Sequence, residues 1–105
     1  MIDGIYDCTI FCDTGMMKLT HRGNVELRVR NGRLSGTMIS TFFWLPSCFR
    51  DGKADGDRFC FTALWNSPCQ QYAMEVEGRV DDDILTGIAR TSIGKFTLEG
   101  RRIAA

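Results

Sequence analysis

Apolar and polar residues alternate along much of the chain, most clearly between residues 24 and 41. Charged residues separate Val25, Leu27 and Val29, and this period of two is typical of a strand with one buried face. The dipeptide Asn31-Gly32 follows, which favours a two-residue hairpin turn because both positions accept positive φ. The pattern predicts a β-hairpin with facing apolar positions: Val29 opposite Leu34, Leu27 opposite Gly36, and Val25 opposite Met38.

The same unit recurs later in the chain. Residues 76–92 align with residues 25–41 without a gap, and valine, glutamate, arginine, leucine and glycine return at matching positions. The dipeptide Asp82-Asp83 replaces the first turn and still accepts turn conformations. A shorter third example is Asp55-Gly56, which we expect to join two further strands. Repetition of a hairpin indicates a meander of antiparallel strands.

Alternating segments continue over the rest of the chain, and we expect a bend or bulge at Arg22-Gly23. Up-and-down strands of this number tend to close into a barrel, because closure removes exposed edges. The sequence therefore predicts an all-β fold, an eight-stranded antiparallel up-and-down β-barrel in a single domain over residues 1–105. A two-layer sandwich is the alternative. Residues 16–21 lead through the bend at Arg22-Gly23 into the central hairpin. The other expected strands are 3–12, 48–53, 58–65, 71–80, 84–92 and 95–103.

The inward positions of such a barrel carry large apolar side chains. An interior of this kind can hold a small hydrophobic ligand, or its own side chains can fill it. The residues predicted to line a ligand site are Tyr6, Leu27, Met38, Phe59, Phe61, Trp65, Tyr72 and Met74.

The most apolar run of the chain follows the central hairpin. Consecutive aromatic residues cannot all face the core from one strand, so a barrel mouth, a lid, a dimer contact or a buried anchor would each explain it. We expect this run to form a protein interface, in a homodimer or with another protein partner. Its residues are Phe42, Phe43, Trp44 and Leu45.

Composition narrows the possible partners. Thirteen basic residues balance thirteen acidic ones in the 105-residue chain, which gives no electrostatic reason to expect binding to nucleic acid or to a membrane surface. The sequence has no window of transmembrane length and no signal-peptide pattern at its start, which indicates a cytoplasmic protein. Five cysteines without a CxxC pair favour free thiols over a disulfide framework.

Residues suited to catalysis are sparse. The single histidine, His21, alternates with Leu19, which favours an interior or rim position over a catalytic one. Cys8 and Cys12 lie about 13 Å apart on one extended strand, too far to share a metal ion. The acidic residues fall in turns or at outward positions. The sequence therefore predicts no enzyme activity, no metal site and no cofactor.

Both ends of the chain carry a family resemblance. Gly4-Ile5-Tyr6 opens the first strand and Arg101-Arg102 lies near the end of the last, which resembles the calycin pattern of a C-terminal arginine packed across an aromatic ring. The segments DGIY, RNGRLSG and DGDRF, with Phe11, are similar to the lipocalin-like negative regulators of type III secretion and their small bacterial relatives. This resemblance implies a dimeric eight-stranded barrel that binds a transcriptional activator. The acidic surface motif of that family has no counterpart here.

Two binding functions are consistent with these patterns. In the first, the barrel holds a small apolar ligand among its inward aromatic side chains. In the second, it is a protein interaction module or a regulator, with the run from Phe42 to Leu45 at the interface.

Overall fold

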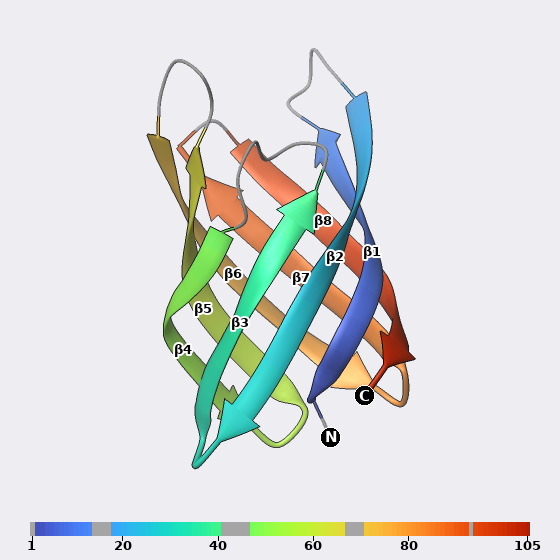
Figure 1. Ribbon diagram of the computed structural model, residues 1–105. Coiled ribbons are helices and arrows are strands. Elements are labelled where there is room, and N and C mark those ends of the chain that lie inside the picture. Colours follow the sequence, from blue (N-terminus) through green and yellow to red (C-terminus); the bar gives the residue numbers. More distant parts are fainter. Residues whose placement is uncertain (1, 14–17, 41–46, 67–70, 93) are drawn as a thin grey trace.

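A closed barrel of eight antiparallel strands forms the whole described fold (Figure 1). The computed structural model describes residues 2–13, 18–40, 47–66, 71–92 and 94–105. Its strands are β1 (Gly4–Asp13), β2 (Lys18–Arg30), β3 (Arg33–Ser40), β4 (Ser47–Asp55), β5 (Arg58–Asn66), β6 (Gln71–Asp81), β7 (Ile84–Thr91) and β8 (Gly94–Ala104).

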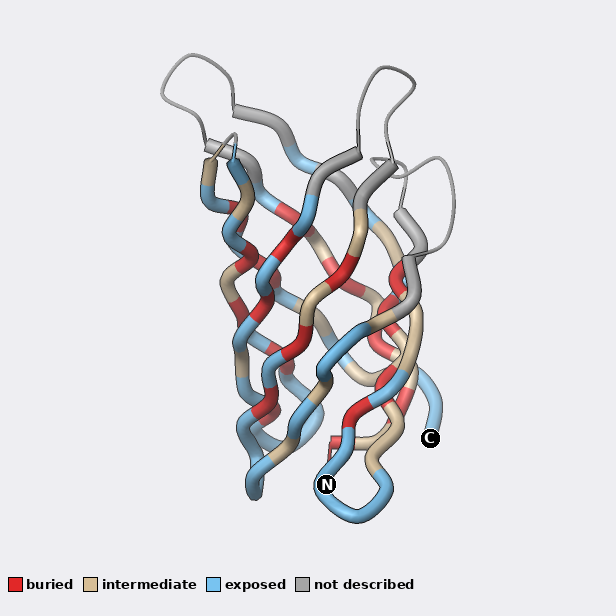
Figure 2. Tube along the Cα trace, turned by 90° about the vertical axis from the view of Figure 1, so that its left-hand side faces the viewer, coloured by how far each residue is buried: buried red, intermediate tan, exposed pale blue. Residues whose placement is uncertain are grey.

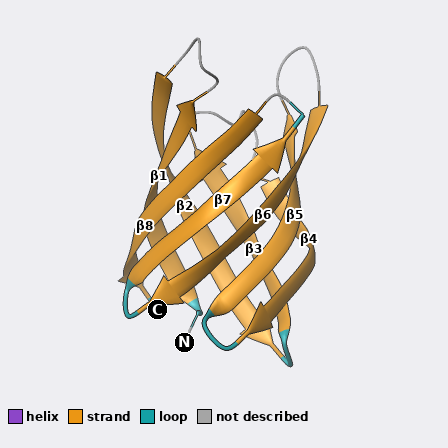
Figure 3. Cartoon of the chain, turned by 180° about the vertical axis from the view of Figure 1, so that it is seen from behind, coloured by secondary structure: helices purple, strands orange, loops and turns teal. Residues whose placement is uncertain are grey.

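Each strand pairs with the next one in sequence, and β8 pairs with β1 to close the ring. The described chain contains strands and short turns but no helix (Figure 3). The predicted up-and-down barrel is confirmed, and the sandwich alternative is wrong.

Side chains alternate between the barrel interior and the outer surface along the strands (Figure 2). On β1, Tyr6, Cys8 and Ile10 are buried, while Phe11 is exposed. The buried residues of the barrel form one continuous hydrophobic cluster. The alternation in the sequence therefore selects which side chains enter the core.

The two repeated hairpins have the same register. In the first, Val29 pairs with Leu34 and Leu27 with Gly36, as predicted. Asn31 and Gly32 both have positive φ, 53° and 77°, which a type I′ turn requires. In the second hairpin, the corresponding pairs are Val80 with Leu85, Gly78 with Gly87, and Val76 with Ala89.

One local prediction is wrong by one residue. The turn between β4 and β5 consists of Gly56 and Asp57, because Asp55 already pairs with Arg58. Glycine at the first turn position has a φ of 64°, which favours this register. Of the bend or bulge expected at Arg22-Gly23, the bulge is excluded, because β2 pairs with β1 there without a register shift.

The bulge lies on β4, at Asp51 and Gly52. The pairing of β4 with β5 shifts by one residue between Arg50 and Lys53, and the pairing with β3 shifts over the same stretch. Asp51 has a φ of 53°, a left-handed conformation that aspartate accepts more readily than most residues. The extra residue lets Phe49 and Ala54, five positions apart, both pack against the core.

A hydrogen-bonded group joins the two ends of the chain. The Tyr6 hydroxyl donates to the carbonyl oxygen of Ile2 at 2.6 Å and accepts from Arg102 Nε at 3.2 Å and Nη2 at 2.8 Å. The Cζ atom of Arg102 lies 5.3 Å from the centre of the Tyr6 ring, within the range of a cation–π contact. The predicted packing of a C-terminal arginine on the first-strand aromatic ring is confirmed.

The same arginine also contacts the turn after β6. Arg102 Nη1 donates to Asp83 Oδ1 at 3.0 Å, and the backbone nitrogen of Arg102 donates to the Asp83 carbonyl oxygen at 2.8 Å. The hydrogen bond to Tyr6, with smaller effects of nearby acidic groups, raises the pKa of Arg102 above its ordinary value. Arg102 thus stays charged and connects β1, β8 and the β6–β7 turn.

Replacement of Tyr6 by phenylalanine tests this connection. We expect Tyr6→Phe to lower the free energy of unfolding by about 2 kcal/mol, because the buried Ile2 carbonyl and the Arg102 guanidinium both lose a partner. Urea titration measures the change. Arg22→Ala, which breaks an exposed ion pair with Asp7, is the matched control and should cost less than about 1 kcal/mol. Equal stability of Tyr6→Phe and the wild type would contradict this role.

Replacement of Gly36 tests the packing between β2, β3 and β4. Gly36 has a φ of 154°, and a Cβ atom there would overlap the Glu26 carbonyl oxygen and lie 3.0 Å from the Phe49 ring. We expect Gly36→Ala to lower the free energy of unfolding by about 3 kcal/mol, measured by thermal and urea unfolding. The exposed neighbour Ser35, replaced by alanine, should change it by less than about 0.5 kcal/mol. A Gly36→Ala protein of wild-type stability would show that the strands can separate at this point without cost.

Candidate functional site

Most of the predicted ligand-binding residues lie in a packed core. Six of them have described side chains, all at most 5% exposed and all in the same hydrophobic cluster: Tyr6, Leu27, Met38, Phe59, Phe61 and Met74. The rings of Phe49 and Phe61 stack with centroids 3.6 Å apart, and Phe59 lies next to Phe61 at 6.0 Å. These side chains occupy the barrel interior themselves.

Glycines at inward positions do not leave open space beside these side chains. A Cβ atom on Gly78 would lie 2.8 Å from the Phe59 ring, and one on Gly100 would overlap the Cys8 sulfur. In both places a neighbouring side chain occupies the volume that a larger residue would take.

The other predicted site residues lie outside the part of the structure that can be described. Residues 41–46, which include Phe42, Phe43, Trp44 and Leu45, are outside it altogether. Trp65 and Tyr72 are register partners on β5 and β6, but their side chains are outside it. The protein interface and the upper part of the ligand site therefore stay predictions.

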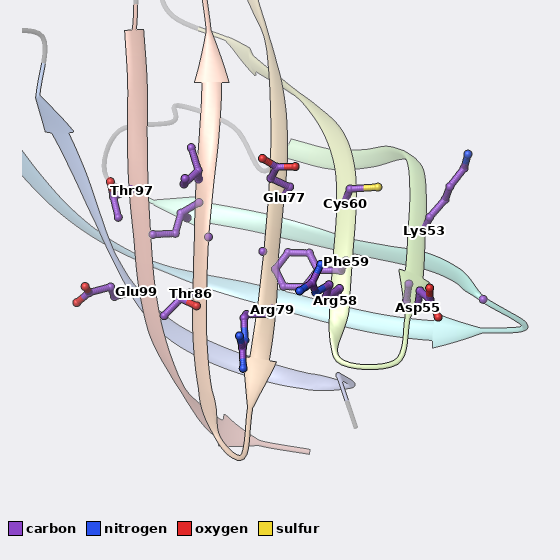
Figure 4. Close-up of a pocket in the computed structure, with 16 residues that line it drawn as sticks. Lys53, Asp55, Arg58, Phe59, Cys60, Glu77, Arg79, Thr86, Thr97 and Glu99 are labelled. Atoms are coloured by element: carbon purple, nitrogen blue, oxygen red, sulfur yellow. The ribbon is translucent and has the colours of Figure 1, made fainter.

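An open groove with a volume of about 900 Å³ lies on the outer face of the barrel. It crosses β4 to β8, and exposed side chains surround it, including Lys53, Arg58 and Glu99 (Figure 4). The inward residues Tyr6 and Leu27 do not line it. We call this feature the outer groove.

The groove follows from the register of five strands. One row of directly paired outward residues runs Lys53, Cys60, Glu77, Ile88 and Thr97 from β4 to β8. The next row, nearer the hairpin turns, runs Asp55, Arg58, Arg79, Thr86 and Glu99. The floor between the rows includes Phe59, Gly78, Gly87 and Leu98.

Charges of the groove are only partly neutralised within the protein. Arg90 Nη1 lies 2.7 Å from Glu77 Oε1, and Arg79 Nη2 lies 3.8 Å from Asp81 Oδ2. In the described part of the chain, Lys53, Arg58 and Glu99 form no ion pair. The Phe59 and Leu98 side chains point into the core, so the floor of the groove is strand backbone. The groove thus combines this backbone floor and the outward side chains of Ile88 and Cys60 with a charged rim.

The two described free cysteines have opposite environments. Cys60 is exposed at the groove, between Lys53 and Glu77 in its row. Cys8 is buried, and burial, with a smaller effect of the Asp7 carboxylate, raises the pKa of its thiol to about 12. Cys8 is therefore an unreactive part of the core. Cys60 is accessible to thiol reagents and can carry a label at the groove.

Neither metal binding nor membrane insertion through a helix finds support in the described residues. No group of three or more His, Cys, Asp or Glu side chains there converges as a metal site. The same part of the chain contains no membrane-spanning helix.

Sequence reasoning missed the outer groove. Its residues come from strands that are far apart in the sequence, and their meeting depends on the registers of four separate strand pairs. The sequence feature that could have indicated the groove is the presence of small side chains, such as Thr86 and Cys60, at outward positions of several strands. Long charged side chains lie next to them.

Comparison with known proteins yields no match among family models, curated proteins or solved structures.

Thiol labelling tests the two cysteine environments. Iodoacetamide at about pH 8 should modify Cys60 in the folded protein and leave Cys8 unmodified, because the Cys8 thiol is buried and has a pKa of about 12. Peptide mapping by mass spectrometry measures each site, and the unfolded protein, in which Cys8 should react, is the control. Modification of both residues at similar rates in the folded protein would contradict the described packing.

Proposed function

We propose that this protein is a non-enzymatic binding barrel that engages a peptide segment of a protein partner in the outer groove. The observation that carries the proposal is the contrast between the two sides of the barrel wall. The described interior is filled by its own side chains, while an open groove of about 900 Å³ crosses the outside of β4 to β8.

The shape and chemistry of the groove favour a peptide over a compact apolar molecule. A small-molecule pocket buries most of its ligand, whereas this groove is open along its length. A peptide laid across the strands would bury an apolar side chain against Ile88 and leave its polar groups at the charged rim.

The lipocalin-like resemblance belongs to this proposal. The closed eight-stranded barrel and the contact between Tyr6 and Arg102 support it, and a regulator that acts by holding another protein would use a surface of this kind. A homodimer formed through residues 42–45 stays a separate prediction beside it.

The test is a peptide selection followed by groove-filling variants. Peptides selected from a random library on the wild-type barrel should bind about tenfold more weakly to the double variant Thr86→Tyr and Thr97→Tyr, whose rings would fill the groove. Fluorescence polarisation measures the affinities. Thr20→Tyr with Asn24→Tyr is the matched control, because both residues are exposed on β2 and neither pairs with a residue of the groove.

Peptides that bind both double variants equally, or a library that yields no binder, would refute the proposal. Native mass spectrometry of protein purified without detergent complements the selection. A small apolar molecule retained by the barrel, together with a failed selection, would favour the interior carrier function instead.

A further inference from the structure

Five cations gather on the outer face of β2 to β6. Arg30 pairs with Arg33, and Arg33 pairs with Lys53, so that three cations occupy directly opposite positions on β2, β3 and β4. In the row nearer the hairpin turns, Arg58 pairs with Arg79 across β5 and β6. All five side chains are exposed. We call this set the basic patch: Arg30, Arg33, Lys53, Arg58 and Arg79.

The basic patch is a local excess in a chain without net charge. Within the described structure its one ion pair is the 3.8 Å contact of Arg79 with Asp81. Asp55 and Asp57 lie beside Arg58, and Glu77, which forms an ion pair with Arg90, lies two positions before Arg79, so five cations lie among four carboxylates. Like charges at directly opposite positions repel each other across strands, and a bound anionic group would relieve that repulsion.

The patch is continuous with the outer groove. Lys53, Arg58 and Arg79 line the groove on its β4 to β6 side, and Figure 4 shows Arg58 next to Phe59. On the β8 side the rim carries Glu99, which has no ion pair in the described structure. The groove thus carries three cations with Asp55 and Glu77 at one end, Ile88 between, and Glu99 at the other end.

We propose that the occupant of the groove is a peptide segment in which an acidic stretch adjoins a short apolar stretch. Arg30 and Lys53 are two strands apart, about 10 Å at the usual strand spacing, and alternate residues of an extended peptide are about 7 Å apart. Two or three carboxylates of one segment can therefore contact the patch while the following residues lie on the groove floor. This inference rests on the proposed function and specifies the chemistry of the partner.

A nucleic acid fits the same surface less well. Each strand of DNA carries a charge about every 3.4 Å over its whole length, so it would extend beyond five cations onto neighbouring carboxylates. Asp55, Asp57 and Asp81 lie among the cations, and Glu99 lies on the far rim. A short acidic peptide can contact Arg30, Arg33 and Lys53, which occupy directly opposite positions, without covering these carboxylates.

The experiment uses a fluorescein-labelled, amidated octapeptide of four glutamates followed by Leu-Val-Leu-Val, with the full-length barrel. We expect binding that weakens as salt is raised and that falls about tenfold when the glutamates are replaced by glutamines. The double variant Arg33→Glu and Lys53→Glu should lose binding to a similar extent. Arg22→Glu with Lys95→Glu makes the same charge change at exposed positions outside the patch and should leave the affinity within about twofold. Circular dichroism establishes that each variant is folded.

Each opposing outcome has a distinct meaning. Equal affinity for the glutamate and glutamine peptides, which needs no variant, overturns the acidic specificity. Tighter binding of a twelve-nucleotide oligothymidylate than of the peptide overturns it in favour of nucleic acid. If the octapeptide does not bind but library-selected peptides bind and respond to Thr86→Tyr with Thr97→Tyr, this inference fails and the proposed function stands. If neither kind of peptide binds, both fail.

Discussion

The pairing of β8 with β1 is the constraint on which the rest of the structure depends. It joins the two ends of the chain along most of the length of both strands, so no strand edge of the ring is left open. Closure by eight strands sets an interior just wide enough for side chains to fill. Tyr6 and Arg102 stabilise this closure from inside the wall, because one phenol oxygen receives two hydrogen bonds from a residue 96 positions away.

Because side chains fill the described interior, the outer surface of the barrel is the place where we propose binding. Small inward residues such as Gly78 and Gly100 accommodate Phe59 and Cys8, so the core reaches close packing by matching small positions to large neighbours. The outer surface has no such requirement. Its rows of paired residues are free to carry charge, and register alone places Arg58 beside Arg79 and Lys53 beside Arg33. In this barrel the core accounts for stability and the surface is where binding is proposed.

The alternation of apolar residues predicted most of the fold because it depends on neighbours along one strand. Val25 to Met38 follows the expected hairpin register, and the pattern of Gly4, Tyr6 and Arg102 predicted the contact between first and last strands. The β4 bulge was not predictable, since Asp51-Gly52 also has the composition of a turn. The groove was missed because it depends on four registers at once. The interface expected at residues 42–45 stays a prediction, as those residues lie outside the described structure.

The extra residue in β4 sets how the length of this strand can vary. Phe49 and Ala54 both pack on the core although an odd number of positions separates them. Loss of one residue at Asp51-Gly52 would leave them four positions apart, so that a regular strand would keep both on the core face. A single-codon deletion at this point of the gene would therefore convert the bulge into regular pairing and leave the faces of β4 unchanged.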